Sequence, residues 1–478
     1  MKRAILVIAS CASHTPAPIE HEPLPPTIEV PPSEAWRSEM PGPGPIDPRR
    51  KPPEFTTEVL PNGLTFMFLR VEGTPVAAVR LATIGGAASD PLRAAGLTFL
   101  TYGTLRDGAG SLDGIGFERT LEKLGADMSI DVDRDHGSIE MAGLDTAAPG
   151  MIRLLADAVI RPRLDPKAIA RRRELHAQRL RARAGGPLSV AGDRLPALIF
   201  ADHPYGHAPH GTIESIGRIG IKDIAAHHAA LLRPERSALI VAGDLDRDAI
   251  RRQAMHYFGA WKANGAAVSI DVPSARPRSR SDLILIHRDN VSQAFVCVGR
   301  AVSGAGASDE VALLAVNQIL GGSFNSRLQL VLRETKGWTY GANSALTSLR
   351  GAGELIACTQ VERRAASEAV RTLLLEVGRL ATEPPNDAEI ESAVLGLQSS
   401  IYRRETVSAL AMLGAQTFAR GGSLTQLEAD LASLSPDAVR RAAAELSPDQ
   451  LQIVVVANAR GLRDEMEKLG LGTVALSE

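Results

Sequence analysis

The stretch Gly96-Leu97-Thr98-Phe99-Leu100-Thr101-Tyr102-Gly103-Thr104-Leu105 follows an Asp90-Pro91 pair and is predicted to form a helix. Residues at helix positions i, i+3 and i+4 share one face, and here that face carries Phe99, Tyr102 and Gly103. Two histidines and a glutamate in this kind of arrangement would hold a catalytic zinc ion and activate its water. None of the three residues is a His, Cys or carboxylate ligand. We therefore expect the aromatic rings to fill the space that a metal site would need.

A second stretch is informative through the spacing of one arginine and one tyrosine. It reads Gly321-Gly322-Ser323-Phe324-Asn325-Ser326-Arg327-Leu328, then Leu332-Arg333-Glu334, then Gly337-Trp338-Thr339-Tyr340. Arg333 offers a rigid fork of donors that suits a peptide carbonyl, and the Tyr340 hydroxyl can donate to an oxygen that becomes negative during peptide hydrolysis. Gly337 suits the end of a helix. The plainer interpretation is that Arg333 is a solvated cation at a helix end and Tyr340 an aromatic residue of a strand.

Together, these stretches resemble peptidase family M16, the pitrilysin or insulinase-like zinc peptidases, and the resemblance covers roughly residues 54 to 460. Active members carry His-x-x-Glu-His where this chain has Phe99, Leu100, Thr101, Tyr102 and Gly103. The resemblance also implies a third ligand, a glutamate, on a helix predicted over residues 165–179. That position falls at or near Arg179, whose guanidinium cannot bind a cation. We therefore expect no catalytic zinc and no metal cofactor on this chain.

The resemblance implies an α+β fold of two homologous halves, each an α/β sandwich, which form a clamshell around a peptide. The predicted strands and helices occur in two similar series along the chain, in agreement with this fold. Apolar residues make up 44% of the 478 residues, enough for large cores. The predicted divisions are a lipoprotein-type signal (1–11), a Pro-rich spacer (12–53), an N-terminal domain (54–261), a linker (262–281) and a C-terminal domain (282–478).

The N-terminus resembles a bacterial lipoprotein signal. Met1-Lys2-Arg3 is basic, and Ile8-Ala9-Ser10-Cys11 is similar to a lipobox in which the cysteine is acylated. Ala12 after the cysteine favours the outer membrane, so we expect a chain anchored in the cell envelope and facing the periplasm. The alternative is a frayed N-terminus with a chance cysteine. The Pro-rich residues that follow are expected to form an extended spacer.

Charge and hydrophobicity argue against several other classes of protein. The net charge is -2, so the chain has no global preference for nucleic acid, and Arg171-Arg172-Arg173 is interpreted as a solvated helix face. No segment approaches the length of a membrane-spanning helix.

His203, His207 and His210 lie in one short loop, and such spacing can chelate a metal. The loop also reads His-Pro-Tyr-Gly, which in M16 proteins caps the next helix, so a structural role is favoured over a metal site.

Two further features have two interpretations each. Cys297 and Cys358 lie in apolar, strand-like runs, so they are buried thiols by default, although an oxidising compartment would allow a disulfide. In M16 peptidases, peptide also binds by adding a strand to an exposed sheet edge. The matching segment is 126–131, where Ser129 replaces the usual asparagine. This departure weakens a peptide-binding role for the first half.

The sequence therefore predicts a non-catalytic M16 subunit. Some M16 peptidases divide the work between two chains, and we expect this chain to supply Arg333 and Tyr340 to a partner chain that carries His-x-x-Glu-His and the zinc ion. The expected substrates are short or unfolded peptides. The alternative is a peptide-binding or scaffold protein that uses the same fold without a peptidase partner. An independent metallopeptidase would need ligands that are missing from the expected positions.

Overall fold

The computed structural model describes residues 52–289, 291–402, 406–471 and 474–477, all within one compact unit. The predicted signal at 1–11 with its Cys11 lies outside the described residues, as does the predicted spacer except for its last two residues. Across the described ranges, no helix has both the length and the apolar character needed to cross a bilayer.

The first half is built on a six-stranded sheet with the strand order β1-β2-β8-β3-β7-β6. The strands are β1 (Thr56–Val59), β2 (Thr65–Arg70), β3 (Val76–Ile84), β6 (Asp127–Val132), β7 (His136–Leu144) and β8 (Ser237–Gly243). The β2–β8 pair is parallel, and the other pairs are antiparallel. A separate pair, β4 (Gly108–Ala109) and β5 (Leu112–Asp113), forms a small ribbon. Alternate residues of β3 enter two different cores, because successive side chains of a strand point to opposite faces.

The helices of the first half lie between and after these strands. They are α1 (Leu97–Thr104), α2 (Gly114–Lys123), α3 (Ala148–Ile160), α4 (Pro166–Arg183), α5 (Pro187–Phe200), α6 (Ile213–Arg218), α7 (Ile221–Leu231) and α8 (Arg247–Phe258). One face of the sheet is covered by α3 and α8, whose apolar residues Met151, Leu155 and Phe258 are fully buried. Residues 259–282, which include the predicted linker, contain no helix or strand.

The second half repeats the same sheet. Its strands are β9 (Leu283–His287), β10 (Gln293–Val302), β11 (Ala342–Ser348), β12 (Gly353–Glu362), β13 (Gln452–Ala457) and β14 (Val474–Ser477). The order β11-β12-β10-β13-β9 matches β6-β7-β3-β8-β2 of the first sheet, and every corresponding pair has the same direction. Only the outermost strand differs, because β14 is parallel to β9 whereas β1 is antiparallel to β2. The predicted α+β fold of two homologous halves is therefore confirmed.

The helices of the second half lie between its strands, and several of them form one core with one face of its sheet. They are α9 (Glu310–Asn317), η7 (Gln318–Gly322), η8 (Gln329–Thr335), α10 (Ala366–Thr382), α11 (Asp387–Tyr402), α12 (Val407–Arg420), α13 (Leu424–Ala432), α14 (Pro436–Ala444) and α15 (Arg463–Glu467). The segments η7 and η8 have the wider π-type turn. Such turns are frequent at functional sites.

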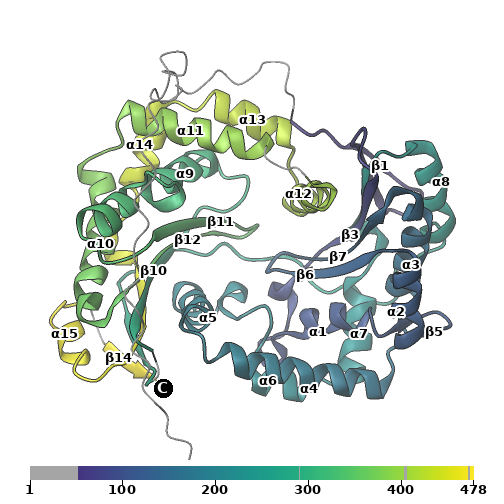
Figure 1. The fold of residues 1–478 in the computed structure, drawn as a ribbon, viewed down its shortest axis with the longest axis horizontal. Helices are drawn as coiled ribbons and strands as arrows, with labels where there is room; N and C mark the ends of the chain where they lie inside the picture. Colours follow the sequence, from purple (N-terminus) through teal and green to yellow (C-terminus); the bar gives the residue numbers. More distant parts are fainter. Residues whose placement is uncertain (1–51, 290, 403–405, 472–473, 478) are drawn as a thin grey trace, which may run out of the picture. The chain divides into compact units, whose positions relative to one another are not determined.

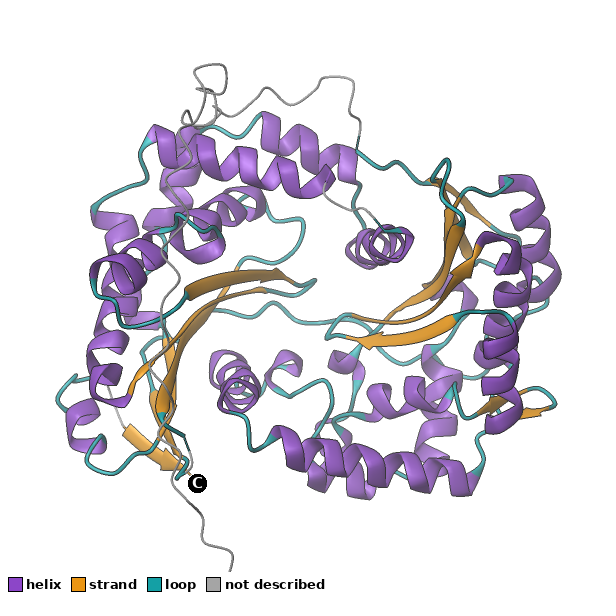
Figure 2. Ribbon diagram, viewed as in Figure 1, coloured by secondary structure: helices purple, strands orange, loops and turns teal. Residues whose placement is uncertain are grey.

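The two halves exchange one helix each (Figure 1). Helix α5 of the first half packs on β10 and β13 of the second sheet, and α12 of the second half packs on β3 and β8 of the first sheet. Figure 2 shows each of these helices lying against the face of the other half's sheet that the helices of that half leave uncovered. Each sheet is therefore closed by its own helices on one face and by the other half's helix on the opposite face.

Candidate functional site

The helix that would carry the zinc motif is present as α1, and Asp90 fixes its start. The carboxylate of Asp90 accepts hydrogen bonds from the backbone N–H groups of Gly96 (2.8 Å) and Thr98 (2.9 Å). The Thr98 hydroxyl donates to the same carboxylate at 2.6 Å and also lies 2.8 Å from Nε2 of His227 on α7. Burial raises the pKa of Asp90 to about 7, against the opposing effect of the hydrogen bonds. The first turn of α1 is therefore hydrogen-bonded to the buried carboxylate of Asp90.

Tyr102 stands where active M16 peptidases carry the catalytic glutamate. Its side chain is fully buried, and its hydroxyl donates to the carbonyl of Gly137 on β7 at 3.0 Å. A Cβ added to Gly137 would lie 2.3 Å from the Tyr102 ring, so only glycine fits beneath it. Burial raises the pKa of the Tyr102 phenol well above its usual value. Tyr102 is therefore a packing residue of the first core.

The two positions of the missing histidines face helix α4. The ring of Phe99 stacks on the ring of His176, with centroids 4.6 Å apart. Gly103 packs closely against Arg172. A Cβ added to the glycine would lie 3.1 Å from Cδ of the arginine. Arg172 donates to both carboxylate oxygens of Asp107, at 2.5 and 2.6 Å. An aromatic stack and a paired guanidinium therefore occupy the space between α1 and α4.

These residues do not fit a zinc ion. Arg172, His176 and Arg179 share one face of α4 by their spacing, and Arg179 is exposed. Nδ1 of His176 is buried without a partner, and burial lowers the pKa of this ring. One imidazole between two permanent cations cannot replace the three His, Cys or carboxylate ligands of a catalytic zinc site. Within the part of the chain that the structure describes, no group of three or more His, Cys, Asp or Glu residues is placed to hold a metal.

The three histidines of the loop make separate contacts. Nε2 of His203 donates to a main-chain carbonyl at 2.7 Å, and Nε2 of His210 lies 3.3 Å from a carboxylate oxygen of Asp193. Nδ1 of His207 lies 3.5 Å from the next carbonyl, and its Nε2 is buried without a partner. Thr212 at the end of the loop caps α6 by accepting from the N–H of Ser215 at 3.1 Å. The loop therefore serves the packing of its neighbours.

Arg333 and Tyr340 lie on either side of the end of η8. Gly337 has the positive φ of 61° that ends the segment, and its N–H donates to the Arg333 carbonyl at 3.1 Å. The guanidinium of Arg333 lies over the ring of Phe324, with Cζ 4.8 Å from the centroid, and Nε is 3.4 Å from a carboxylate oxygen of Glu334. Tyr340 is 97% exposed, so its ring makes almost no contact with the rest of the chain. The Arg333 side chain is 36% exposed, so both side chains reach solvent, Tyr340 far more than Arg333.

Two other predicted features can be located. The segment around Ser129 forms β6, which is at the edge of the first sheet, and the serine side chain is exposed opposite Glu140 of β7. An edge strand presents unpaired main-chain groups along its outer side. Cys297 and Cys358, whose state the sequence left open, are register partners on β10 and β12 and form a disulfide.

Three residues of these sites were not predicted from the sequence. His176 and Arg172 were not recognised as the residues that meet Phe99 and Gly103, because their positions depend on how α4 packs against α1. Phe324 was not recognised as the partner of Arg333. A signal for Phe324 was present in the sequence, since a large aromatic residue in a Gly- and Ser-rich turn has no local packing partner.

The fold and these sites define a peptidase-like protein of two homologous halves whose zinc helix has lost its ligands. The chain belongs to peptidase family M16. Residues 67–211 match the family model described as Insulinase (Peptidase family M16), and residues 218–397 match the model described as Peptidase M16 inactive domain.

Similar proteins agree with this assignment. The chain is 25% identical to an uncharacterized zinc protease of Mycobacterium leprae over 62% of this chain and 66% of that protein. It is 23% identical to a non-peptidase homolog of Helicobacter pylori over 56% of this chain and 61% of the relative. The crystal structure of a protease from Helicobacter pylori superposes with a TM-score of 0.80 at 19% identity, and covers 85% of this chain and 100% of that one. This last likeness concerns the fold alone.

Proposed function

We propose that this chain is a non-catalytic subunit of a heteromeric M16 peptidase, and that it supplies Arg333 and Tyr340 to a partner chain that holds zinc through His-x-x-Glu-His. The observation that carries the proposal is the contrast between two sites. Phe99, Tyr102 and Arg172 fill the first, whereas the second keeps an arginine and a tyrosine open to solvent. The name of the Helicobacter pylori relative, a non-peptidase homolog, agrees with a chain that has no peptidase activity of its own.

The chemistry of the two residues suits peptide hydrolysis in a shared site. The planar guanidinium of Arg333 presents several N–H donors in a fixed geometry, which can hold a peptide carbonyl in one orientation. The hydroxyl of Tyr340 can donate to the oxygen that gains negative charge as the carbonyl is attacked, an effect typically worth about 10²–10³ in kcat. The partner would contribute the zinc ion and the general base. The substrates would be short or unfolded peptides, because only an extended chain exposes its main-chain carbonyls.

The test is to co-express the chain with an M16 chain that carries the zinc motif and to measure hydrolysis of a quenched fluorescent peptide. Arg333→Ala and Tyr340→Phe should each lower kcat/KM at least tenfold, with the zinc content and the subunit ratio unchanged. Arg364→Ala is a matched control, because Arg364 is an exposed arginine paired with Glu362 on another part of the same half. Unchanged activity in both test variants would refute the role. Purification of this chain without a zinc-motif partner would favour the scaffold function instead.

The proposed location is the cell envelope, with Cys11 as the lipid anchor. The Cys297–Cys358 disulfide supports this proposal, because structural disulfides form and persist mainly in oxidising compartments such as the periplasm. Metabolic labelling with a palmitate analogue should mark the full chain, and Cys11→Ala should abolish the label and release the protein from membranes. Labelling that survives in the Cys11→Ala variant would contradict the anchor.

A further inference from the structure

The surface around Arg333 is unusual for its exposed apolar side chains. Phe324 is 68% exposed, Leu330 is 48% exposed, and Tyr340 is almost fully exposed, all between η7 and β11. Aromatic residues and arginine are enriched where proteins bind other chains. Of these residues, Phe324 contacts Arg333, and the two together are called the Arg333 surface below.

Phe324 determines how Arg333 is presented. The guanidinium stacks over the ring at 4.8 Å, a cation–π contact that favours one position of an otherwise flexible side chain. Nε of Arg333 lies 3.4 Å from a carboxylate oxygen of Glu334, and its two Nη groups would be the donors to a ligand. The exposure of Phe324 shows that much of its ring is also open to solvent.

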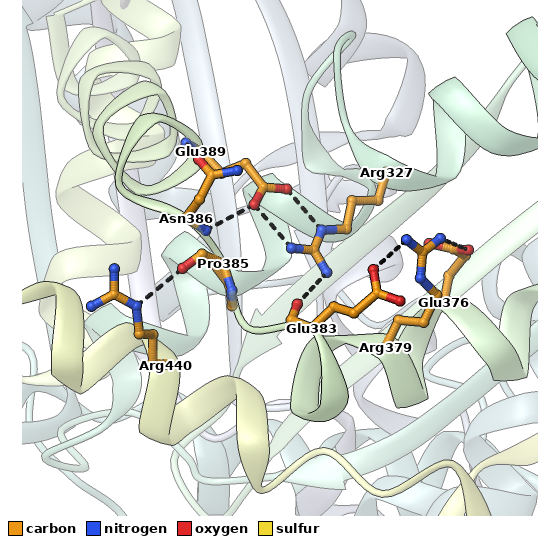
Figure 3. A network of polar contacts seen from close by, with 8 residues as sticks. All are labelled: Arg327, Glu376, Arg379, Glu383, Pro385, Asn386, Glu389 and Arg440. Atoms are coloured by element: carbon orange, nitrogen blue, oxygen red, sulfur yellow. Dashed lines mark hydrogen bonds and ion pairs between the residues drawn. The ribbon is translucent and has the colours of Figure 1, made fainter.

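Arg327, three residues after Phe324 in the sequence, is held by a network of polar contacts (Figure 3). Nε and Nη2 of Arg327 donate to the two carboxylate oxygens of Glu389 at 2.7 and 2.9 Å, and Nη1 donates to the Glu383 carbonyl at 2.9 Å. The hydrogen bonds from Arg327 are the main reason that the pKa of Glu389 lies below its usual value. A bidentate pair of this kind adds geometric specificity as well as energy.

Two more arginines hold the segment to which Arg327 is bound (Figure 3). Arg379 donates to the side chain of Glu383 at 2.5 Å and to that of Glu376 at 2.9 Å. Arg440 donates to the Pro385 carbonyl at 3.1 Å. Arg327, three residues after Phe324, is therefore part of a network that joins α10, α11 and α14. A rigid support lowers the conformational entropy that a ligand must remove on binding.

We infer that Phe324 is a specificity-determining residue of the peptide site, which takes an apolar side chain of an extended peptide next to the carbonyl held by Arg333, and that Arg327 is its positioning residue. The inference rests on the proposed function. Apolar side chains are favoured because the ring of Phe324 offers a rigid apolar face. Basic side chains are disfavoured because the guanidinium of Arg333 itself lies over the Phe324 ring, with Cζ 4.8 Å from the centroid.

The experiment measures binding of fluorescent peptides of equal length to the full chain, by anisotropy. The peptides carry Phe, Ser or Lys at one central position. The parent protein should bind the Phe peptide at least fivefold more tightly than the Ser peptide and should bind the Lys peptide weakest. Phe324→Ala should remove the preference for Phe over Ser, and Phe324→Tyr should restore it. Arg327→Gln should weaken the preference and increase hydrogen exchange in residues 323–328, whereas Arg364→Ala should change neither.

The outcomes distinguish a failure of the proposed function from a failure of the role of Phe324. If Arg333→Ala binds all peptides as the parent does, the proposed function itself fails. If Arg333→Ala weakens all three peptides equally but Phe324→Ala keeps the parent's preference, only the role of Phe324 is overturned. If the isolated chain binds no peptide, the same series is run as kcat/KM on the complex with the zinc-bearing chain. If Phe324→Ala leaves the preference for the Phe peptide unchanged in the complex, the inference is overturned. Thermal unfolding of each variant confirms that the fold is retained.

Discussion

Arg134 and Glu354 form an ion pair with an N–O distance of 3.1 Å, and the two residues belong to different halves of the chain. Arg134 lies in the turn between β6 and β7, and Glu354 lies on β12. Next to this pair, the carboxylate of Asp135 accepts from the N–H of Arg350 at 2.7 Å and from the hydroxyl of Tyr205 at 2.6 Å. Largely buried polar contacts therefore join the β6–β7 turn of the first sheet to the β11–β12 turn of the second sheet.

Removing one member of the ion pair should cost more than removing both. Arg134→Met leaves Glu354 buried without its cation, and Oε1 of this carboxylate already lacks a partner. The unfolding free energy should fall by about 3–5 kcal/mol, as for other broken buried pairs. The double variant Arg134→Met with Glu354→Met should lose less, because no uncompensated charge remains. Urea unfolding measures both values, and a double variant less stable than the single one would contradict this account.

Restoring the zinc motif alone should not restore a zinc site. The triple variant Phe99→His, Tyr102→Glu and Gly103→His places new ligands on α1, but α4 still presents Arg172 and Arg179 and offers no carboxylate there. The new glutamate would also replace a fully buried tyrosine and destabilise the first core.

We expect well under one equivalent of zinc in this triple variant after dialysis, as measured by elemental analysis. Tyr102→Phe is the matched control for folding, because it keeps the ring and loses only the hydrogen bond to Gly137. Its unfolding free energy should fall by about 1 kcal/mol. Stoichiometric zinc in the triple variant would show that the cations of α4 do not decide the outcome.

Asp90 should make the stability of the protein depend on pH near neutrality. Its folded-state pKa of about 7 lies above the ordinary value of 3.8. Between these values the folded chain therefore keeps a proton that the unfolded chain has released. The contribution of this group is fully present below about pH 4 and is lost as the pH rises through 7.

Asp90→Asn removes that titration, so its unfolding free energy relative to the parent should rise with pH. The slope should be about 1.4 kcal/mol per pH unit between pH 4 and 7. Urea unfolding at several pH values measures the difference. A difference that stays constant over this interval would show that Asp90 is ionised in the folded protein throughout.

The Cys297–Cys358 disulfide should stabilise the second half. It closes a segment with a sequence separation of 61 residues and joins two neighbouring strands. Replacing both cysteines by serine should lower the unfolding free energy by about 2–4 kcal/mol under oxidising conditions. The parent should show the same loss when it is fully reduced. Equal stability of the oxidised parent and the double variant would argue against the bond in solution.

The features that could be predicted from the sequence are those set by residues close together along the chain. The helix over Leu97–Thr104 follows from its spacing and its start at Asp90, and the end of η8 follows from Gly337. The two similar halves follow from two similar series of strands and helices along the chain. The strand order within each sheet was not predicted, because β8 lies between β2 and β3 although it is far from both in the sequence.

The features that sequence reasoning did not reach depend on packing between distant segments. The stack of Phe99 on His176 needs the relative position of two helices, and the cysteine pairing needs the register of β10 against β12. The placement of α5 is a similar case. Its apolar residues show that it is buried, but they do not show that it is buried against the other half's sheet.

The reciprocal placement of α5 and α12 makes the chain behave as an interlocked pair. If the linker between residues 262 and 281 were cleaved, each fragment would still hold a helix that the other needs, so the fragments should stay associated. A gene fragment that encodes one half alone would yield a sheet with one bare apolar face, prone to aggregation. The two halves of this chain should therefore not be removed or redesigned independently, because each one covers an apolar sheet face of the other.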